Sequence, residues 1–237
     1  MAIVPGLRLA HDPRMSHPLW PLFDLRVRTA RLELRVPMDE DLVRLAAVAR
    51  AGIHDPADMP FAHPWTDPPS PQFERSFAQY QWTRRGDWRP ERWNLGLGVF
   101  LKGEPGGTAE PIGMQNMFAA DFATLRSVSS GSWLGRPHQG RGLGTEMRGA
   151  MLALAFDGLG AWVALSEAFT DNVASIGVSR RLGYEENGRG LIARRGEPAE
   201  TLRFRLTRER WASRPRAEVR IEGLEACLEL FGIPSGP

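Results

Sequence analysis

The chain of 237 residues contains only one cysteine, Cys227, so no disulfide can form within it. The same shortage excludes a zinc site built on cysteine pairs, and we expect no metal. No apolar run approaches the roughly 20 residues that span a bilayer, and the first residues lack the ordered regions of a signal peptide. We therefore expect a cytoplasmic protein that does not act in a membrane.

Lysine is nearly absent as well, since Lys102 is the only one, and arginine carries the positive charge. The formal net charge is +2 and the pI is about 9.2. This slight basic excess favours an anionic ligand weakly and nucleic acid more weakly still, and an ordinary arginine-rich surface explains it equally well. The hydrophobic fraction of 42% indicates a globular chain with one sizeable core.

Periodicity along the chain predicts a set of strands and helices. The expected strands cover residues 28–36, 93–101, 110–117, 126–134, 162–167 and 201–206, with a turn at 103–107 and a late strand at 217–221. The expected helices cover residues 39–51, 72–85, 143–156 and 172–182, with a short one from Leu224. Residues 53–71 are rich in Pro, Asp and His, which predicts a long loop, and such loops are usually functional.

These elements fit one α+β domain with a mixed, mostly antiparallel sheet flanked by helices. We assign the domain to residues 18–212. Residues 1–17 show no periodicity and are expected to form a flexible extension. Residues 213–237 are expected to be a C-terminal extension that packs on the same domain.

A glycine-rich segment follows the strand that ends at Leu134 and precedes the helix from Leu143. Gly140, Gly142 and Gly144 alternate in the run QGRGLGT, so the backbone can turn tightly and expose consecutive N–H groups at the helix start. Such a nest binds anions, phosphate above all. The spacing matches neither the dinucleotide-binding fingerprint nor the P-loop, and a turn without ligand remains an alternative.

Four blocks of the chain resemble the GNAT acyltransferase superfamily. The stretch SGSWLGRPHQGRGLGTEMRGAML resembles its motif A, and RTARLELRVPMDED, DNVASIGVSRRLGYEENG and ETLRFRLTRERW resemble blocks of the branch that contains ribosomal-protein N-terminal acetyltransferases. Tyr184 stands where the branch usually has phenylalanine. The resemblance covers about residues 25–212 and implies the GNAT fold, whose sheet is splayed at the coenzyme A site.

The resemblance also implies where acyl-CoA would bind. Backbone groups of the splayed strand at Trp133, Leu134 and Gly135 would pair with the pantetheine arm, and Asn172 would contact the same arm or merely cap a helix. Amides of the glycine-rich loop would cradle the pyrophosphate, namely those of Gln139, Gly140, Arg141, Gly142, Leu143, Gly144 and Thr145.

Catalytic residues are less well defined by the resemblance. Ser175 would lie near the thiol and is a candidate acid, although a small residue in a first helical turn has a plain structural role. Candidate bases are Glu167 and His54, with His63, Asp55 and His138 as further alternatives. Asp55 and Trp65, both in the long loop, are candidates for the acceptor pocket.

The expected activity is transfer of an acyl group from CoA to a primary amine by direct attack. Acetyl is the default donor group, and succinyl is the alternative because several segments resemble an actinobacterial GNAT group with a succinyl-CoA-using member. The acceptor is a small molecule or a peptide, and a homo-oligomer stays open. Two other functions remain: a non-catalytic CoA-binding sensor, and acyl transfer from aminoacyl-tRNA, for which an arginine-rich tail would supply the RNA contacts (Arg203, Arg205, Arg208, Arg210, Arg214, Arg216 and Arg220).

Overall fold

The computed structural model describes residues 17–103 and 108–234. Residues 1–16 of the extension expected over 1–17, and most of the turn at 103–107, therefore lie outside the described residues. The strands are β1 (Arg26–Arg28), β2 (Leu32–Arg35), β3 (Arg92–Leu101), β4 (Glu110–Ala120), β5 (Ser127–Leu134), β6 (Val163–Phe169), β7 (Glu185–Arg194), β8 (Glu197–Thr207) and β9 (Arg220–Glu222). The helices are η1 (Pro21–Phe23), α1 (Asp39–Ala51), α2 (Gln72–Gly86), α3 (Phe122–Leu125), η2 (Arg136–His138), α4 (Leu143–Ala153), η3 (Leu154–Gly158), α5 (Val173–Arg181), α6 (Arg208–Ala212) and η4 (Glu225–Phe231).

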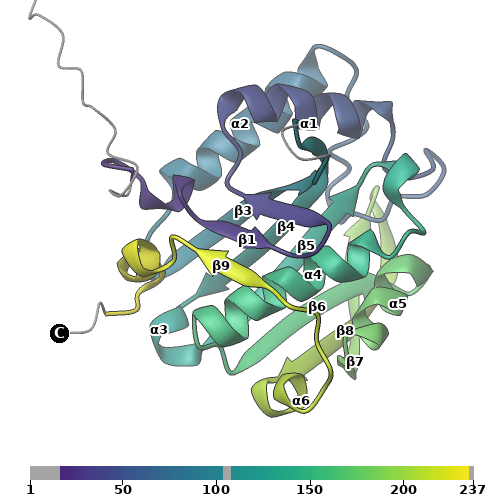
Figure 1. The fold of residues 1–237 in the computed structure, drawn as a ribbon. Helices are drawn as coiled ribbons and strands as arrows, with labels where there is room; N and C mark the ends of the chain where they lie inside the picture. The colour runs from purple at the N-terminus through teal and green to yellow at the C-terminus, as the bar shows by residue number, and fades with distance from the viewer. Residues whose placement is uncertain (1–16, 104–107, 235–237) are drawn as a thin grey trace, which may run out of the picture.

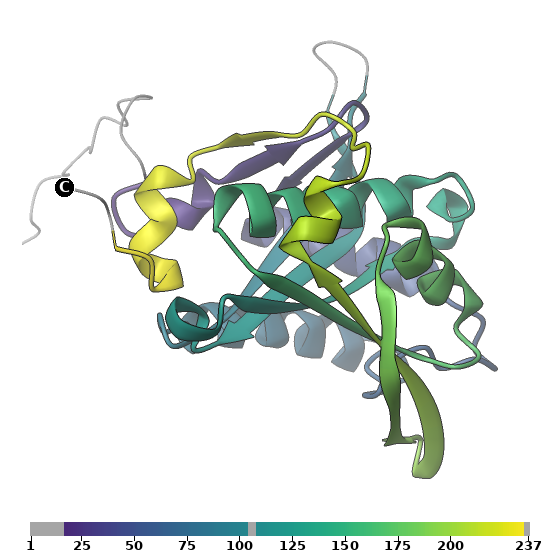
Figure 2. The same ribbon diagram turned by 90° about the horizontal axis from the view of Figure 1, so that it is seen from below.

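All of these strands form one open sheet in the order β7-β8-β6-β5-β4-β3-β2-β1-β9. The pairs are antiparallel except for β5 and β6, which run parallel. Helices α1 and α2 cover one face of the sheet and α4 crosses the other (Figures 1 and 2). The expected α+β class with a mixed, mostly antiparallel sheet is confirmed.

The N-terminal strand differs from the expectation. Residues 28–36 do not form one strand, because the chain reverses between β1 and β2. The Thr29 amide donates to the Leu32 carbonyl at 2.9 Å, and the Leu32 amide donates to the Thr29 hydroxyl at 2.9 Å, which closes the turn. Val27, Leu32 and Leu34 are all fully buried. Buried apolar residues therefore lie on both sides of the turn, so hydrophobic alternation by itself does not reveal that the chain reverses there.

Strand β7 was not expected from the sequence, and β8 begins four residues before the expected start at Thr201. Most of β7 is exposed on both faces, so its residues carry no alternation that could reveal a strand. It exists because it pairs along β8. The two strands form the long hairpin that projects from the body of the molecule in Figure 2.

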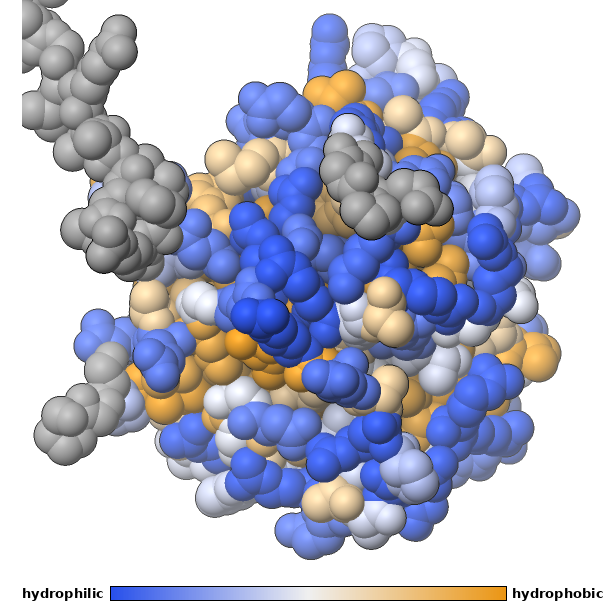
Figure 3. All heavy atoms as spheres, in the orientation of Figure 1, coloured by the Kyte–Doolittle hydropathy of each residue, from blue (hydrophilic) through white to orange (hydrophobic). Residues whose placement is uncertain are grey.

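The C-terminal residues complete the sheet and the core. β9 pairs with β1, slightly later than the expected strand at 217–221, and Arg28 forms an ion pair with Glu222 across that edge. Cys227 and Phe231 of η4 are fully buried in the main core. The expected helix over 143–156 is α4 followed by a π-helical turn. Figure 3 shows a mostly hydrophilic surface on this face, with hydrophobic surface between β9 and α4.

The central parallel pair is short. β5 and β6 pair only from Ser127 to Ser129, whereas β4 stays paired with β5 as far as Leu134. β6 meanwhile stays paired with β8 as far as Phe169. The C-terminal halves of β5 and β6 thus diverge, and each leaves one edge without a strand partner in the described part of the sheet. The sheet is splayed immediately before the glycine-rich loop.

Candidate functional site

The glycine-rich loop forms an exposed nest of amides at the start of α4. Gly140 and Gly142 have φ values of +71° and +76°, a left-handed conformation that favours glycine. None of the amide N–H groups from Gly140 to Thr145 donates a hydrogen bond to another described residue. The free donors lie at the positive end of the α4 dipole, so the loop can receive an anion.

A polar cluster fixes this loop to the β1–β2 turn. Arg31 donates to Glu146 of α4 at 2.7 Å and to the Arg141 carbonyl at 3.2 Å, while the Thr29 hydroxyl donates to Glu146 at 2.6 Å. Burial alone would raise the pKa of Glu146, but the hydrogen bonds from Thr29 and Arg31 outweigh it and hold that pKa below its usual range. The carboxylate stays charged at neutral pH and anchors the loop. The sequence alone did not indicate this role of Arg31 and Glu146.

Arginines surround the opening of the nest. Arg141 is exposed within it, Arg31 lies beside Gly142, and Arg181 of α5 donates to the Thr145 hydroxyl at 3.2 Å. Arg181 lies one residue from Arg180, which instead pairs with Glu186 at 2.6 Å. Positive side chains thus reinforce the attraction of the free amides for an anion.

Gln139 differs from the rest of the loop. Its backbone amide donates to the Arg136 carbonyl, so the run of free amides begins at Gly140. Its side-chain amide donates to the carbonyls of Leu134 and Ile53, both at 2.8 Å. Gln139 therefore joins the end of β5 to the start of the long loop and shapes the site through its side chain.

The alternation of β5 decides which backbone groups face the gap. The Gly135 amide donates to the Ile112 carbonyl at 2.8 Å, so Gly135 and, by alternation, Trp133 direct their backbone groups toward β4. Leu134, Ser132 and Ser130 direct theirs toward the diverging β6. Of the three residues expected to pair with pantetheine, only Leu134 has backbone groups on the open edge. Ser132 and Ser130 are the positions that sequence reasoning missed.

The Trp133 side chain packs on the face covered by α1 and α2. There it contacts Trp65 and Phe77, with ring centroids 5.9 and 6.3 Å away, and Trp65 stacks on Phe73. The long loop is therefore pinned by Trp65 to the splayed strand, beside the gap. Trp88 and Trp93 instead belong to the main core, where both pack against Phe231.

Asn172 and Ser175 open α5 on the β6 side of the gap. The Asn172 side chain accepts from the Ser175 amide at 3.0 Å, so the cap that we considered for Asn172 is present. The Ser175 hydroxyl accepts at 3.4 Å from Arg148, which lies in α4. The Ser175 side chain is half-buried, and Arg148 fixes the position of its hydroxyl.

The candidate bases occupy different settings. Both ring nitrogens of His54 are engaged inside the long loop, with the Asp55 carbonyl at 2.7 Å and the Thr66 hydroxyl at 2.8 Å. Asp55 accepts from the Ala57 amide and so stabilises a turn. Glu167 is exposed on β6, two residues past the last pairing with β5. It accepts from Thr201 at 2.5 Å and pairs with Arg203 at 3.3 Å. Only Glu167 of these three lies in the splayed strands.

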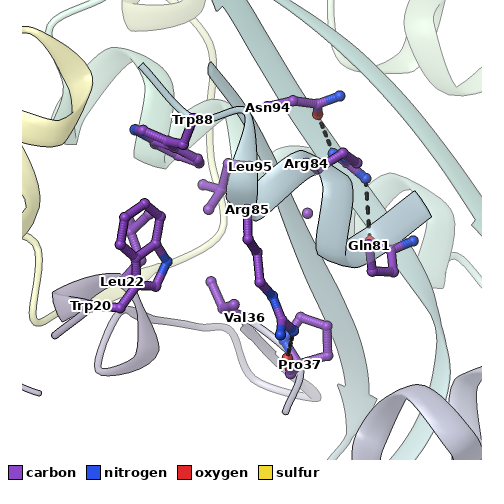
Figure 4. A pocket seen from close by; sticks show the side chains of 11 residues that line it. Trp20, Leu22, Val36, Pro37, Gln81, Arg84, Arg85, Trp88, Asn94 and Leu95 are labelled. Atoms are coloured by element: carbon purple, nitrogen blue, oxygen red, sulfur yellow. Dashed lines mark hydrogen bonds between the residues drawn. The ribbon is translucent and has the colours of Figure 1, made fainter. Parts of the chain in front are cut away.

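A separate hollow beside α2 belongs to the packing of the N-terminal half. Figure 4 shows Trp20 and Trp88 on one side of it and Arg84 on the other. Arg84 is buried and donates to Asn94, Asn116 and Gln81, all neutral acceptors, and burial lowers its pKa to about 10. None of the lining residues belongs to the glycine-rich loop or to the gap.

Among the described residues, no group of three or more His, Cys, Asp or Glu side chains comes together as a set of metal ligands. Nor does any helix in residues 17–103 or 108–234 have the length and apolar character needed to cross a membrane.

Comparison with known proteins gives a family and a fold. Residues 31–185 match the model of the acetyltransferase (GNAT) domain. The chain also resembles solved structures. RimJ of Mycobacterium smegmatis, in complex with CoA-disulfide, is 19% identical, with a TM-score of 0.64 over 83% of this chain and 92% of that one.

Two further solved structures show the same fold. A GCN5-related N-acetyltransferase from Brucella melitensis is 18% identical, with a TM-score of 0.63 over 79% of this chain and 80% of that one. The Microcin C7 self immunity acetyltransferase MccE, in complex with acetyl-CoA and AMP, is 14% identical, with a TM-score of 0.57 over 75% of this chain and 93% of that one.

Proposed function

The chain belongs to the GNAT acetyltransferase domain family, and from that premise we propose that it transfers an acetyl group from acetyl-CoA to a primary amine. The observation that carries the proposal is the nest of free amides from Gly140 to Thr145 at the head of a splayed pair of strands. The nest and the gap between the splayed strands are adjacent in the chain and in space. A pyrophosphate bound at the nest would send its pantetheine arm into the gap.

The open edge of β5 supports this path for the donor. An extended pantetheine arm carries amide groups and can add to a strand edge as another strand would. The edge positions Leu134, Ser132 and Ser130 follow one another from the nest toward the vertex of the splay. The Leu134 carbonyl already accepts from Gln139 and the Ser130 amide completes the ladder with β6, so of these three only Ser132 has both backbone groups free in the described part of the sheet. The acyl end would then lie near Ser130, between β5 and the start of α5.

Two side chains at this point are suited to the chemistry. The amine attacks the thioester carbon, so it must lose a proton, and the thiolate of CoA leaves. Glu167 on β6 faces the acceptor side and would accept the amine proton, directly or through water. The Ser175 hydroxyl would donate to the departing sulfur. A backbone amide of β5 would stabilise the oxyanion, an effect typically worth about 3 kcal/mol.

The acceptor would enter between the long loop and the β7–β8 hairpin. Arg195, at the tip of that hairpin, donates to both carboxylate oxygens of Asp67 at 2.9 and 3.1 Å. Arg194 pairs with Asp171 at 2.8 Å and lies over the Phe169 ring. These contacts hold the hairpin against the loop and bound the acceptor side of the gap with charges of both signs, which suits a small or terminal amine.

The tail arginines do not favour the tRNA alternative. Four of the seven pair with carboxylates: Arg203 with Glu167, Arg210 with Glu185, Arg216 with Asp157 and Arg220 with Glu222. Arg208 and Arg214 donate to backbone carbonyls. An RNA surface needs a broad array of unneutralised cations, and carboxylates neutralise four of these seven.

Turnover assays with acetyl-, propionyl- and succinyl-CoA test the proposed function. We expect release of free CoA thiol from acetyl-CoA that depends on an added amine, offered as a peptide with a free N-terminus and as a small polyamine. A preference for succinyl-CoA would keep the transfer and change the donor. Binding of CoA without turnover of any amine would instead favour the sensor, and salt-dependent retention of tRNA would favour the RNA alternative.

Replacing Arg181 with alanine tests the charge around the nest. We expect the KM for acetyl-CoA to rise about five- to tenfold with kcat nearly unchanged, because one exposed charge at a phosphate contributes roughly 1 kcal/mol in both ground and transition states. Arg180→Ala is the matched control, since Arg180 pairs with Glu186 and not with the loop. Equal KM values for the two variants would remove Arg181 from the site.

A further inference from the structure

Arg148 is a buried cation that has no carboxylate partner among the described residues. It lies in α4 and is only 5% exposed. Its guanidinium donates to the Ser179 hydroxyl at 2.9 Å and to the Ser175 hydroxyl at 3.4 Å, and its Nε has no partner among the described residues. Burying an unpaired charge is costly, so a structural link between α4 and α5 alone does not explain an arginine here.

The surroundings of Arg148 form a buried polar cluster at the vertex of the splay. The Tyr184 hydroxyl faces the Ser130 hydroxyl, and neither oxygen makes a normal hydrogen bond to another described group. Ser130 is the first β5 residue beyond the residues paired with β6. Ser175 lies in the first turn of α5, the helix that follows β6. The cluster therefore contains residues from both sides of the gap, and Arg148 of α4 contacts it through Ser175.

The cluster holds one positive charge and no negative charge. Tyr184 is the one titratable group that acts on Arg148 across this packing, and burial raises the pKa of Tyr184 to about 12, so the phenol stays neutral. Burial lowers the pKa of Arg148, and with only hydroxyls around it the guanidinium lacks a counter-ion. Such a site stabilises an anion that arrives from outside.

We propose that Arg148 is a positioning residue that favours the thiolate form of CoA at the end of the gap. Its charge acts on the sulfur through the Ser175 hydroxyl, which accepts from Arg148 and is thereby left to donate its own proton in a hydrogen bond to sulfur. The proposal rests on the proposed function, because that function places the CoA sulfur beside Ser175.

The step to which Arg148 contributes is the departure of CoA. The amine nitrogen forms a bond to the thioester carbon, the carbon–sulfur bond breaks, and its electron pair goes to sulfur. The proton lost by the amine passes to the base or to water, and the thiolate takes a proton from solvent once it is released. The products are an amide and CoA thiol. A nearby positive charge lowers the pKa of a thiol and so eases the departure of sulfur.

The test compares CoA with desulfo-CoA, which lacks the sulfur, as ligands of the wild-type protein and of Arg148→Met. For the wild type we expect the ratio of the affinity for CoA to the affinity for desulfo-CoA to rise at least tenfold as the pH increases through the pKa of the CoA thiol. In Arg148→Met both ligands should bind with the same pH dependence. The kcat for acetyl transfer should fall about a hundredfold, as when a donor to a developing anion is removed, with KM for acetyl-CoA within about twofold.

Two measurements separate this role from a structural one. Methionine fills a similar volume, and replacing an uncompensated buried charge with an apolar side chain is often neutral or stabilising. Arg148→Met should therefore keep or raise Tm while it loses activity. Ser179→Ala removes the other hydrogen bond of Arg148 and keeps its charge, and should retain the pH dependence of CoA binding.

The outcomes are distinguishable. If CoA shows the same pH-dependent binding in the wild type and in Arg148→Met, Arg148 has no effect on the thiolate and the inference is overturned, while the proposed function stands. The same follows if the Tm of Arg148→Met falls and its kcat falls only in proportion to the unfolded fraction. If the wild-type protein binds neither ligand, the proposed function itself fails.

Discussion

Replacing Gly140 with glutamate is expected to abolish the binding of acetyl-CoA. Gly140 lies in the exposed part of the nest, with nothing within 4 Å of the position that a Cβ would take, so the new side chain fits without a clash. Its carboxylate would stand where we propose that the pyrophosphate binds, and two like charges about 4 Å apart repel by about 1–4 kcal/mol. Together with the loss of space for the phosphates, we expect at least a hundredfold loss of affinity in isothermal titration calorimetry.

The matched control is Gly196→Glu. Gly196 lies in the β7–β8 turn, has a φ of +87° against +71° for Gly140, and also faces open space. Both variants therefore carry the same new charge and a similar backbone strain of roughly 1–2 kcal/mol. Gly196→Glu should bind acetyl-CoA as the wild type does. If the two variants bind equally well, the nest is not the donor site.

Replacing Glu167 with glutamine is expected to lower kcat by about a hundredfold, the lower end of what removing a general base costs. The amide keeps the size of the side chain and can still accept from the Thr201 hydroxyl. KM for acetyl-CoA should stay within about twofold, since the proposal places the carboxylate on the acceptor side and not at the nest. The measurement is the steady-state release of CoA thiol, repeated over a range of pH.

Glu200→Gln is the control for this variant. Glu200 lies in β8 and pairs with Arg189 at 2.6 Å, much as Glu167 pairs with Arg203, but it is three residues from the Glu167 partner on that strand. It should leave kcat unchanged. If Glu167→Gln retains wild-type kcat over the whole pH range, the amine proton leaves by another route.

The sequence predicted the loop and missed the residues that hold it. The alternate glycines require left-handed backbone, which few other residues adopt, so the local sequence is enough to indicate a nest. Arg31 and Glu146 are more than a hundred residues apart, and no local pattern relates them. Only the fold brings the β1–β2 turn against the first turn of α4.

The backbone contacts expected from β5 likewise depend partly on the local sequence and partly on the fold. The strand itself follows from composition, whereas the direction of each amide depends on its register with β4. A shift of one residue would have placed Trp133 on the open edge in place of Leu134. Strand β7 is a stronger case, because its exposed residues become a strand only through pairing with β8.

By itself the sequence determined the class of fold, most of the helices and the glycine-rich nest, because periodicity and glycine conformation are properties of neighbouring residues. The tertiary structure alone decided which backbone groups line the gap and that both His54 ring nitrogens are occupied. It also decided that Arg148 donates to Ser175 with no counter-ion in the part of the chain that the structure describes. These depend on register, burial and contacts between distant segments. A buried charge is a feature of its surroundings, and Arg148 acquires its surroundings only when α4, α5 and β5 meet.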